Sequence, residues 1–371
     1  MVTVLYRGGF QGRRLQFLLD VITRVHGDIE LVWLHPDTTW EAPWFDQWVR
    51  ERPWVVGHDK LDGSARALPA VRRTLRRRFR RRSQVVYAIG SLSLPYGRAL
   101  SPSALVWCIN GIPEERLLYD KGLRSRATVG AEWLVARAGR RPDLVVTVSD
   151  PMGELISRRL PGVQWVKAPT CVEVEIFRPM DQTQRSYLTY VGSGAPWQCL
   201  DLLGAVWQAL HRIDPTLKFR VVSRDDRSRV LLAGLPDSAV EMHGTTRPVE
   251  VARMLWEAEL GFLMRTPDIV NKASFPTKFG EYVAADVPVV TTDVGWEISS
   301  IIQETGCGLI VDWRADAEMI ARAIASFRAR ATTDTAIREG CRKAAVALDR
   351  TAWVESLSGH LRRALPRPAN G

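Results

Sequence analysis

The stretch of sequence that decides the fold runs from Glu259 to Gly295 and reads ELGFLMRTPDIVNKASFPTKFGEYVAADVPVVTTDVG. It opens with a short apolar run, Glu259–Met264, and Arg265 follows at once, which is typical of a buried parallel strand with a charge at its carboxyl end. Pro276 fits the first position of a helix, because the N–H that proline lacks has no partner there. A second apolar run then ends in a turn. The stretch therefore predicts a strand, a polar loop, a helix and a second strand.

The predicted helix carries a cation and a carboxylate on one face. Lys278 lies in its first turn, where a cation opposes the helix dipole by roughly 0.3–1 kcal/mol. A bound anion would reverse that penalty, because a charge-assisted hydrogen bond contributes about 1.5–3 kcal/mol. Glu281 follows three residues later on the same face. A cation at a helix N-terminus suits phosphate and the carboxylate suits hydroxyl groups, so the pair predicts a sugar-nucleotide site. A solvated Lys–Glu pair on an ordinary surface helix is the alternative.

This stretch resembles the donor-site region of the retaining glycosyltransferase family 4, which has the GT-B fold. The matching residues are Arg265, Asn271, Ser274, Pro276–Glu281 (PTKFGE), Pro288–Val290 and Gly295. The resemblance implies that the amino end of the helix faces the donor diphosphate and that Glu281 binds the ribose. The family pattern also has a glutamate eight positions earlier, where this chain has Ala273. The chain is therefore similar to a branch with a PTKFGEY-type segment, and its sugar specificity stays open.

Length and composition bound the class of protein. A chain of 371 residues suits two domains, each able to bury its own core, and no apolar run approaches the length of a membrane span. The first residues read as a strand and not as a signal peptide, which predicts a cytoplasmic protein. The cysteines are odd in number and widely spaced without a CxxC pair, so they read as reduced thiols: Cys108, Cys171, Cys199, Cys307 and Cys341.

The net charge of +10 is unevenly distributed. Residues 1–180 hold 28 lysines and arginines against 18 acidic residues, whereas residues 181–371 hold 23 of each. The whole excess belongs to the first half. Such an asymmetry predicts a polyanionic partner for that half, either a membrane surface or nucleic acid.

Apolar strand-like runs alternate with helical patterns along both halves of the chain, which predicts an α/β protein built from βαβ units with mainly parallel sheets. The polar segment Phe177–Ser186 (FRPMDQTQRS) reads as a linker. Two Rossmann-like domains with a cleft between them are the GT-B architecture that the resemblance implies. The predicted domains are an acceptor domain over 1–178 and a donor domain over 179–350. A final helical segment, 351–371, returns to the first domain by resemblance.

Two glycine loops follow predicted strands. Gly8 and Gly9 come after the first strand, where glycines let the backbone approach a ligand. The resemblance makes this an acceptor and phosphate loop, and a plain tight turn is the alternative. The second half opens with YVGSGAPW, Tyr190–Trp197. Members of the family have an arginine and a lysine just after this loop. Here Ser193 or Gly194 and Gln198 stand at those places, so charge compensation falls on Arg265, Lys278 and Lys272.

The predicted site residues follow from these motifs and the resemblance. Asn110 follows an apolar strand near a position where family members have histidine or arginine, and it could hydrogen-bond a sugar but not act as a base. The catalytic set comprises Arg265, Lys278 and Asn110. The donor-binding set comprises Gly192, Ser193, Arg265, Asn271, Lys272, Thr277, Lys278 and Glu281.

A basic segment in the first half predicts an amphipathic helix. Its apolar residues, Leu68, Val71, Leu75 and Phe79, recur at helical spacing, and arginines fill the rest: Arg72, Arg73, Arg76, Arg77, Arg78, Arg80, Arg81 and Arg82. Such a helix can lie on an anionic membrane, each cation adding about 1 kcal/mol. The nearby tryptophans Trp40, Trp44, Trp48 and Trp54 would suit the headgroup region. The alternative is that the apolar stripe and the tryptophans face the domain core.

The sequence thus predicts a cytoplasmic GT-B glycosyltransferase, peripheral on the inner face of a membrane. It would move sugar from a nucleotide-diphosphate sugar to a glycan, a lipid-linked sugar or a small molecule. Retention of configuration is implied by the resemblance. The sequence has no DxD motif, so no metal and no cofactor are expected. A sugar-nucleotide epimerase of the same fold is the second hypothesis, though Ala273 and Asn110 do not favour it. A nucleic-acid-binding protein is the third, and the lack of a recognisable binding motif argues against it.

Overall fold

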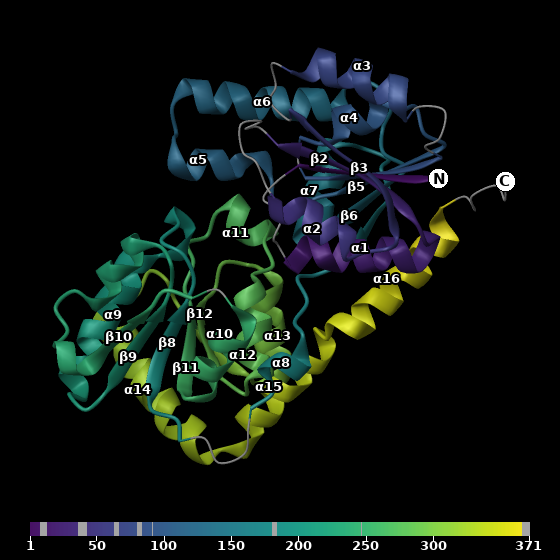
Figure 1. The fold of residues 1–371 in the computed structure, drawn as a ribbon. Coiled ribbons are helices and arrows are strands. Elements are labelled where there is room, and N and C mark those ends of the chain that lie inside the picture. Colours follow the sequence, from purple (N-terminus) through teal and green to yellow (C-terminus); the bar gives the residue numbers. More distant parts are fainter. Residues whose placement is uncertain are drawn as a thin grey trace. The chain divides into compact units, whose positions relative to one another are not determined.

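A computed structural model describes residues 1–7, 13–35, 43–62, 67–79, 84–90, 92–179, 184–245 and 247–365. The chain divides into two compact units (Figure 1). Unit 1 comprises residues 1–169 and 351–371, and unit 2 comprises residues 170–350. The division lies upstream of residue 178, where the sequence analysis put it. Backbone hydrogen bonds explain why: Val172 N–H donates to Leu348 O at 3.0 Å, and Arg350 N–H donates to Val172 O at 3.0 Å, so this segment is tied to the end of unit 2.

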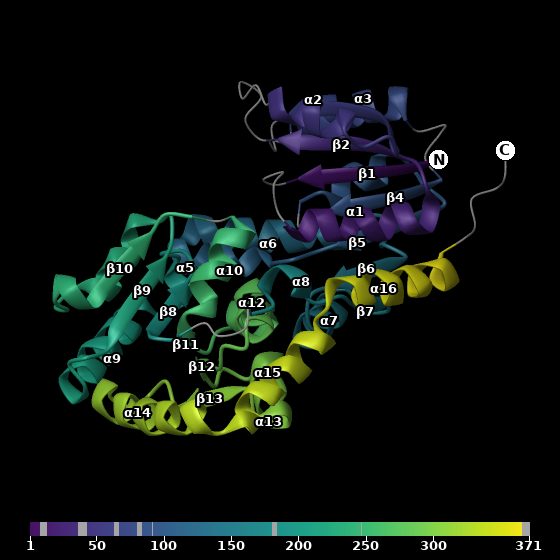
Figure 2. The ribbon, with the colours of Figure 1, turned by 60° about the horizontal axis from the view of Figure 1, so that its bottom comes forward.

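Unit 1 contains a seven-stranded sheet in which all neighbouring strands are parallel. The strand order is β3-β2-β1-β4-β5-β6-β7, and Figure 2 shows β2, β1, β4, β5 and β6 in that sequence. The connections change direction between β1 and β4, which makes this pair the switch point of the sheet. The strands are β1 (Val2–Arg7), β2 (Ile29–His35), β3 (Val55–Asp62), β4 (Val85–Ile89), β5 (Ala104–Cys108), β6 (Leu144–Thr147) and β7 (Trp165–Lys167).

Helices cover both faces of this sheet (Figure 1). One face carries α1 (Arg13–His26), α2 (Pro43–Arg50), α7 (Asp150–Arg159) and α16 (Arg350–Ala364). The other carries α3 (Leu68–Arg78), α4 (Leu94–Ala99) and α6 (Leu123–Arg137), with the short turns η1 (Pro113–Glu115) and α5 (Arg116–Tyr119) leading into α6. Helix α16 docks on α1, where Ser358 Oγ donates to Val21 O at 3.4 Å and Leu357 and Leu361 are buried.

Unit 2 contains a six-stranded parallel sheet with the order β10-β9-β8-β11-β12-β13. Its strands are β8 (Tyr187–Val191), β9 (Lys218–Val222), β10 (Val240–His243), β11 (Ala258–Leu263), β12 (Val289–Thr292) and β13 (Gly308–Val311). Its helices are α8 (Val174–Phe177), η2 (Pro196–Gln198), α9 (Leu200–Ile213), η3 (Asp226–Leu232), η4 (Asp237–Ala239), α10 (Pro248–Trp256), α11 (Ile269–Ala273), α12 (Thr277–Ala284), α13 (Glu297–Thr305), α14 (Ala317–Thr333) and α15 (Thr335–Ala347).

The core of unit 2 forms where α9 packs on the sheet. Trp207 is fully buried, and its ring lies 5.1 Å from that of Phe219 and 5.6 Å from that of Phe262, centroid to centroid.

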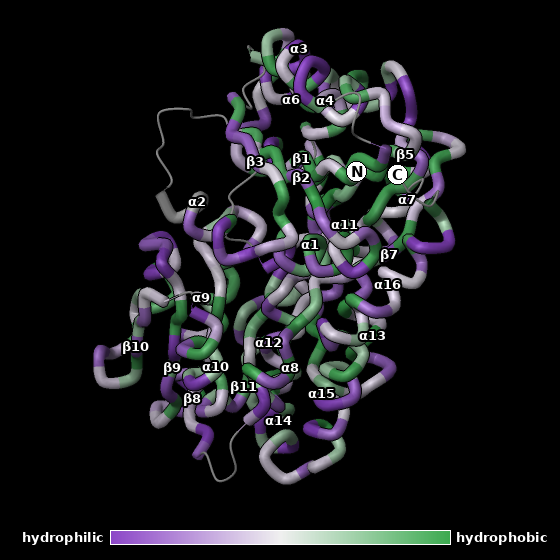
Figure 3. Tube along the Cα trace, turned by 45° about the vertical axis from the view of Figure 1, so that its right-hand side comes forward, coloured by the Kyte–Doolittle hydropathy of each residue, from purple (hydrophilic) through white to green (hydrophobic). Residues whose placement is uncertain are grey.

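In Figure 3 the strands of unit 1 near β1 and β5 are largely hydrophobic, as expected of parallel strands covered on both faces. The two Rossmann-like parallel-sheet domains confirm the predicted α/β fold class. Among the described helices, none is long and apolar enough to cross a membrane.

The arginine-rich helix α3 does not present its apolar residues to the outside, as a helix that inserts them into a membrane would. Val71, Leu75 and Phe79 are buried, so the apolar stripe of α3 faces the core of unit 1, which was the alternative reading of the sequence. Arg80, Arg81 and Arg82 lie outside the described residues, as does Trp40, and the side chain of Trp44 is likewise outside them. Trp48 and Trp54 pack edge to face with ring centroids 6.1 Å apart, and the Arg52 guanidinium lies 3.9 Å from the Trp48 ring.

Candidate functional site

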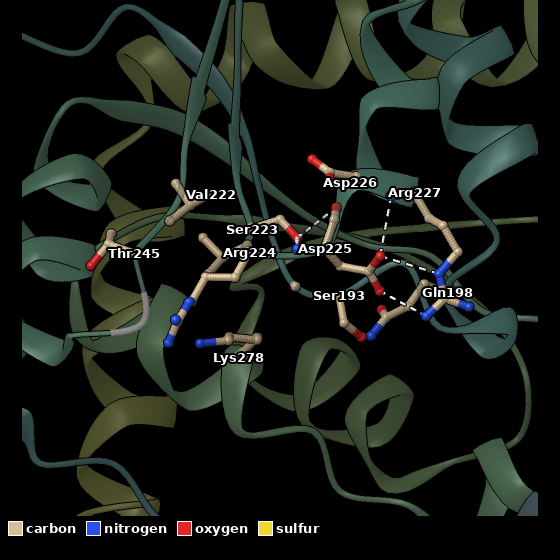
Figure 4. Close-up of a pocket in the computed structure, with 12 residues that line it drawn as sticks. Ser193, Gln198, Val222, Ser223, Arg224, Asp225, Asp226, Arg227, Thr245 and Lys278 are labelled. Atoms are coloured by element: carbon tan, nitrogen blue, oxygen red, sulfur yellow. Dashed lines mark hydrogen bonds and ion pairs between the residues drawn. The ribbon is translucent and has the colours of Figure 1, made fainter.

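A cavity of about 720 Å³ lies at the carboxyl ends of β8, β9 and β10 in unit 2 (Figure 4). Helix α12, which follows β11, contributes one lining residue. Because β8 and β11 are the pair at which this sheet's connections change direction, the cavity occupies the place where open α/β sheets bind ligands. The cavity is lined by Val191, Gly192, Ser193, Gln198, Val222, Ser223, Arg224, Asp225, Asp226, Arg227, Thr245 and Lys278.

The loop after β8 needs its glycines because of close approaches. A Cβ on Gly192 would lie 2.4 Å from the Tyr190 hydroxyl oxygen, which donates to Ser193 O at 2.7 Å. A Cβ on Gly194 would lie 2.4 Å from the Cβ of Arg227. The tight turn holds Gly192 and Ser193, both predicted donor-binding residues, in the cavity wall.

Lys278 lies in the first turn of α12, as predicted, and its side chain lines the cavity. Its Nζ donates to Glu281 Oε2 at 2.8 Å, and the Glu281 side chain is only 2 % exposed, so the pair is not the fully solvated one of the alternative reading. Pro276 is not the first helical residue. It precedes the helix with an extended backbone (φ −68°, ψ 128°), and α12 begins at Thr277. An ammonium group has three protons, so Lys278 can bind Glu281 and still donate to an anion in the cavity.

A second cation, Arg224, was missed by the sequence analysis. It lies two residues beyond the end of β9 and is exposed. Figure 4 shows the side chains of Arg224 and Lys278 pointing into the same part of the cavity. The available signal was its place after a buried strand, but only the strand order reveals that β9 ends beside β8. Arg224 therefore supplies positive charge near a loop that lacks the arginine and lysine expected from the resemblance.

Asp225 ties the β9 loop to the glycine loop. Its carboxylate accepts hydrogen bonds from Gly194 N–H at 2.9 Å and from Arg227 Nη2 at 2.8 Å and Nε at 3.1 Å. The side-chain hydrogen bond from Arg227 lowers the pKa of Asp225 to about 2. Asp225 therefore remains ionised across the ordinary pH range and keeps the two loops together at the cavity rim.

Arg265 contacts Gln198 and is not itself part of the described cavity wall. It lies two residues beyond the end of β11, and only 4 % of the residue is exposed. Its Nη1 donates to Gln198 Oε1 and, at 2.8 Å, to Met264 O, while its backbone N–H donates to Thr292 Oγ1 at 2.8 Å. Burial lowers the pKa of its guanidinium. Gln198 lines the cavity, so Arg265 acts on it through that amide and not through the direct contact that the sequence analysis expected.

The remaining predicted donor residues are not part of the described cavity wall. Asn271 is 1 % exposed, and its amide donates to Thr266 O at 2.9 Å and Asp268 Oδ2 at 2.8 Å, so it braces its own loop. Lys272 is exposed and lies near Gly295. Thr277 opens α12 and Glu281 is buried behind Lys278. Of the eight predicted donor-binding residues, the described cavity wall includes Gly192, Ser193 and Lys278.

Unit 1 has a cavity of about 560 Å³ at the corresponding edge of its sheet. It lies beyond the ends of β1, β4 and β5, next to that sheet's switch point. It is lined by Arg7, Leu92, Ile112, Pro113, Glu115, Arg116, Tyr119, Asp120, Ser125 and Glu132. Burial raises the pKa of Glu115 and of Glu132, and Arg116 Nη2 lies 3.6 Å from Glu132 Oε1.

The residues predicted in unit 1 have other positions. Gly8 and Gly9 lie outside the described residues. Asn110 is exposed, and its Oδ1 accepts a hydrogen bond at 3.0 Å from Arg14 Nε, whose guanidinium also donates to Pro169 O at 2.9 Å. Asn110 is not part of the described cavity wall of unit 1. Within the described parts of the chain, no three histidine, cysteine, aspartate or glutamate side chains gather in a way that could hold a metal ion.

Comparison with known proteins agrees with this geometry. Residues 185–329, within unit 2, match the family model for glycosyl transferases group 1. No curated protein sequence matches the chain significantly. Among solved structures, sucrose-phosphate synthase from Thermosynechococcus elongatus is similar with a TM-score of 0.73 and 15 % identity, covering 98 % of both chains. Anabaena Alr3699/HepE in complex with UDP has a TM-score of 0.71 and 12 % identity, covering 98 % of this chain and 99 % of that one.

A third similar structure is WaaG, a glycosyltransferase involved in lipopolysaccharide biosynthesis, with a TM-score of 0.68, 14 % identity and coverage of 97 % and 99 %. At these identities the likeness establishes the fold, and the fold is GT-B, as predicted. The match of residues 185–329 to the family model and the likeness in fold together support a GT-B glycosyltransferase.

Proposed function

We propose that the protein transfers a sugar from a nucleoside diphosphate sugar to an acceptor, and that the donor binds in the cavity of unit 2. The observation that carries the proposal is the meeting of a glycine loop, two cations and a helix N-terminus at the switch point of one sheet. Residues 185–329, which include the lining residues of this cavity, also match the family model for glycosyl transferases group 1. The similar HepE was solved with UDP and with UDP-glucose, which supports a nucleotide-sugar donor here.

The proposed chemistry places the diphosphate against Lys278, Arg224 and the first N–H groups of α12. Negative charge grows on the diphosphate as its bond to the sugar breaks, and preorganised cations and helix N–H groups stabilise that charge. Arg265 is a positioning residue, because its guanidinium orients Gln198 at the cavity wall. The membership of family 4, retention of configuration and the transfer of the acceptor proton to the leaving diphosphate remain proposals that rest on the resemblance.

We further propose that the acceptor binds in the cavity of unit 1. Its arginines donate hydrogen bonds and its carboxylates accept them, which suits a sugar hydroxyl group that does both. The Asn110 oxygen already accepts one hydrogen bond from Arg14, so a role for Asn110 in sugar binding would use its amide N–H groups or the second lone pair of that oxygen. Neither the epimerase nor the nucleic-acid hypothesis is favoured by a specific contact in the described residues.

A binding screen tests the proposal. Thermal unfolding is measured with UDP, GDP, ADP, CDP and dTDP, because a ligand that binds the native state alone adds about 2.7 kcal/mol of stability at one hundred times its Kd. One nucleoside diphosphate should raise the melting temperature clearly above the others, and the corresponding nucleotide sugars should then be turned over. A protein that no nucleoside diphosphate stabilises does not use this cavity as proposed.

Metal independence is tested on the same activity. The proposed mechanism assigns charge stabilisation to protein groups, and the sequence has no DxD motif. Turnover should therefore persist in EDTA. Loss of turnover in EDTA with recovery on adding Mg²⁺ or Mn²⁺ would show that a metal shares the role given to Lys278 and Arg224. Cell fractionation would test the proposed cytoplasmic location.

A further inference from the structure

Helix α6 has an apolar outer face in addition to its buried one. Its inner side is formed by Ser125, Val129, Trp133 and Ala136, all buried in unit 1. On the opposite side Leu123, Ala127, Ala131 and Leu134 recur at intervals of three and four residues, which places them on one face. Leu123 is 86 % exposed and Leu134 is 66 % exposed. These four residues are called the α6 stripe.

Exposed apolar side chains concentrate around the α6 stripe. Among the described residues, twelve large hydrophobic side chains are exposed, and four of them fall within the short segment from Tyr119 to Val135. The four are Tyr119, Leu123, Leu134 and Val135. Tyr119 ends α5, and the other three residues lie on α6. Scattered single exposures need no explanation, but a cluster within one short segment marks an interaction surface.

Cations border the α6 stripe. Residues 121–141 contain six lysines and arginines and a single acid, Glu132, whose side chain is 12 % exposed and lies near Arg116. Arg124, Arg126 and Arg137 are exposed. The acceptors of Arg126 and Arg137 are the carbonyl oxygens of Lys121 and Arg159, so these contacts leave the cationic charges uncompensated.

The exposed arginines of α3 belong to the same face of unit 1. Helices α3, α4 and α6 lie in one layer over the sheet (Figure 1), and Arg76 Nε donates to Ala99 O while Arg98 Nη1 donates to Val135 O. Arg73, Arg76 and Arg77 are exposed, whereas Arg78 binds both oxygens of Asp59. Because the apolar stripe of α3 is buried, α3 can offer a partner charge only, and the α6 stripe offers the apolar contact.

We propose that the α3–α4–α6 face of unit 1 docks on an anionic lipid membrane, with the α6 stripe entering the boundary between headgroups and acyl chains. A narrow apolar stripe bordered by arginines on a helix lying flat is the arrangement of interfacial helices. The arginines of α6 and α3 meet lipid phosphates, because unit 1 holds 30 lysines and arginines against 17 acidic residues, while unit 2 holds 21 against 24. This docking is independent of the sugar transfer proposed above.

Co-sedimentation with vesicles tests the docking. The protein is mixed with phosphatidylcholine vesicles that contain no phosphatidylserine, about 20 % or about 40 %, so that the surface charge of the vesicles varies. The stripe variant Leu123→Ser/Leu134→Ser should bind about tenfold more weakly at every composition, since it removes apolar contact. The charge variant Arg73→Gln/Arg76→Gln/Arg77→Gln should lose about fivefold per arginine, only on anionic vesicles and less at high salt.

A matched control carries the same chemical change elsewhere. Ile213→Ser/Met319→Ser replaces two exposed apolar residues of unit 2 and should bind vesicles as the wild type does. All these positions are exposed, so every variant should keep the wild-type melting temperature and the wild-type nucleoside diphosphate affinity.

Three results would overturn the proposal. The first is a wild-type protein that does not sediment with vesicles of about 40 % phosphatidylserine, and the second is a stripe variant that sediments like the control. The third is a dimer in sedimentation equilibrium that the stripe variant abolishes, together with vesicle binding that it leaves unchanged, since that would assign the α6 stripe to a second copy of the chain.

Discussion

The two cavities occupy equivalent places in two sheets whose strand orders agree except for one additional edge strand, β7, in unit 1, and their side chains differ. In unit 2 the wall combines a glycine loop with Arg224 and Lys278 and also holds two aspartates, of which Asp225 is bound by Arg227. In unit 1 it combines Arg7 and Arg116 with three carboxylates, two of them with raised pKa values. The comparison teaches that strand order decides where a cavity forms, while the residues just beyond the strand ends decide what it can bind. Cations beside a helix N-terminus suit a diphosphate, and mixed donors and acceptors suit hydroxyl groups.

The largest effect is expected at Lys278. The Lys278→Ala protein should bind its nucleoside diphosphate about 1.5–3 kcal/mol more weakly, roughly ten- to a hundredfold, because a charged hydrogen bond to phosphate is lost. Isothermal calorimetry measures the difference. Lys272→Ala is the matched control, since Lys272 lies in the same stretch but outside the described cavity wall. Equal affinities for wild-type and folded Lys278→Ala protein would remove the basis for a diphosphate site in unit 2.

A smaller effect on binding, and a clear one on stability, is expected at Arg265. Arg265→Ala leaves the Gln198 and Met264 oxygens without a buried donor, which should lower the free energy of unfolding by about 1–3 kcal/mol. Urea unfolding measures this, and calorimetry should show a weaker loss of nucleotide affinity than in Lys278→Ala. The opposite pattern, unchanged stability with a binding loss as large as that of Lys278→Ala, would mean that Arg265 contacts the ligand directly.

A change confined to unit 1 should separate the two cavities. Glu115→Gln removes a charged acceptor of hydroxyl hydrogen bonds, so the KM for the acceptor should rise about fivefold, as expected for a loss near 1 kcal/mol. Steady-state kinetics measures KM, and the affinity for the nucleoside diphosphate should stay at the wild-type value. Glu154→Gln serves as an exposed control on α7. If Glu115→Gln changes donor affinity and leaves acceptor KM alone, the assignment of the two cavities is wrong.

The smallest effect concerns pH, and it has opposite signs in the two units. The pKa of Asp225 is lowered to about 2, so its contribution to stability is present above the ordinary aspartate pKa and is lost as pH falls toward 2. The pKa of Glu115 is raised, so its contribution becomes less favourable as pH rises from the ordinary glutamate range toward the raised value. Unfolding free energies of Asp225→Asn and Glu115→Gln against wild type should therefore diverge in opposite directions with pH. Parallel curves would contradict the comparison.

Local patterns in the sequence predicted the parts of the site that depend on neighbouring residues. The strand, loop and helix around Lys278 follow from apolar spacing, from a proline and from one charge pair, all within a short stretch. Arg224 could not be found in this way, because its position depends on β9 pairing with β8. The sequence correctly predicted Arg265 near the end of a strand. The orientation of its guanidinium, however, depends on Gln198, which is distant in sequence.

The same distinction explains the surface of unit 1. The arginine-rich segment around Arg76 drew attention because its charges are consecutive, yet burial of Val71 and Leu75 determines what α3 can contact. The α6 stripe carries few charges and small residues, so its pattern resembles an ordinary buried face until Val129 and Trp133 are seen to occupy the inner side. An amphipathic pattern identifies an apolar face, but packing decides which face meets the core.

The return of α16 to unit 1 has a consequence for synthesis. Unit 2 is one continuous segment, residues 170–350, whereas unit 1 needs residues 351–365 to cover α1. A chain made from its N-terminus therefore completes unit 2 before unit 1 can close, although the first strands of unit 1 emerge earlier. Until Leu357 and Leu361 arrive, the apolar surface they cover stays open to water. Unit 1, whose synthesis begins first, is therefore the unit that finishes folding last.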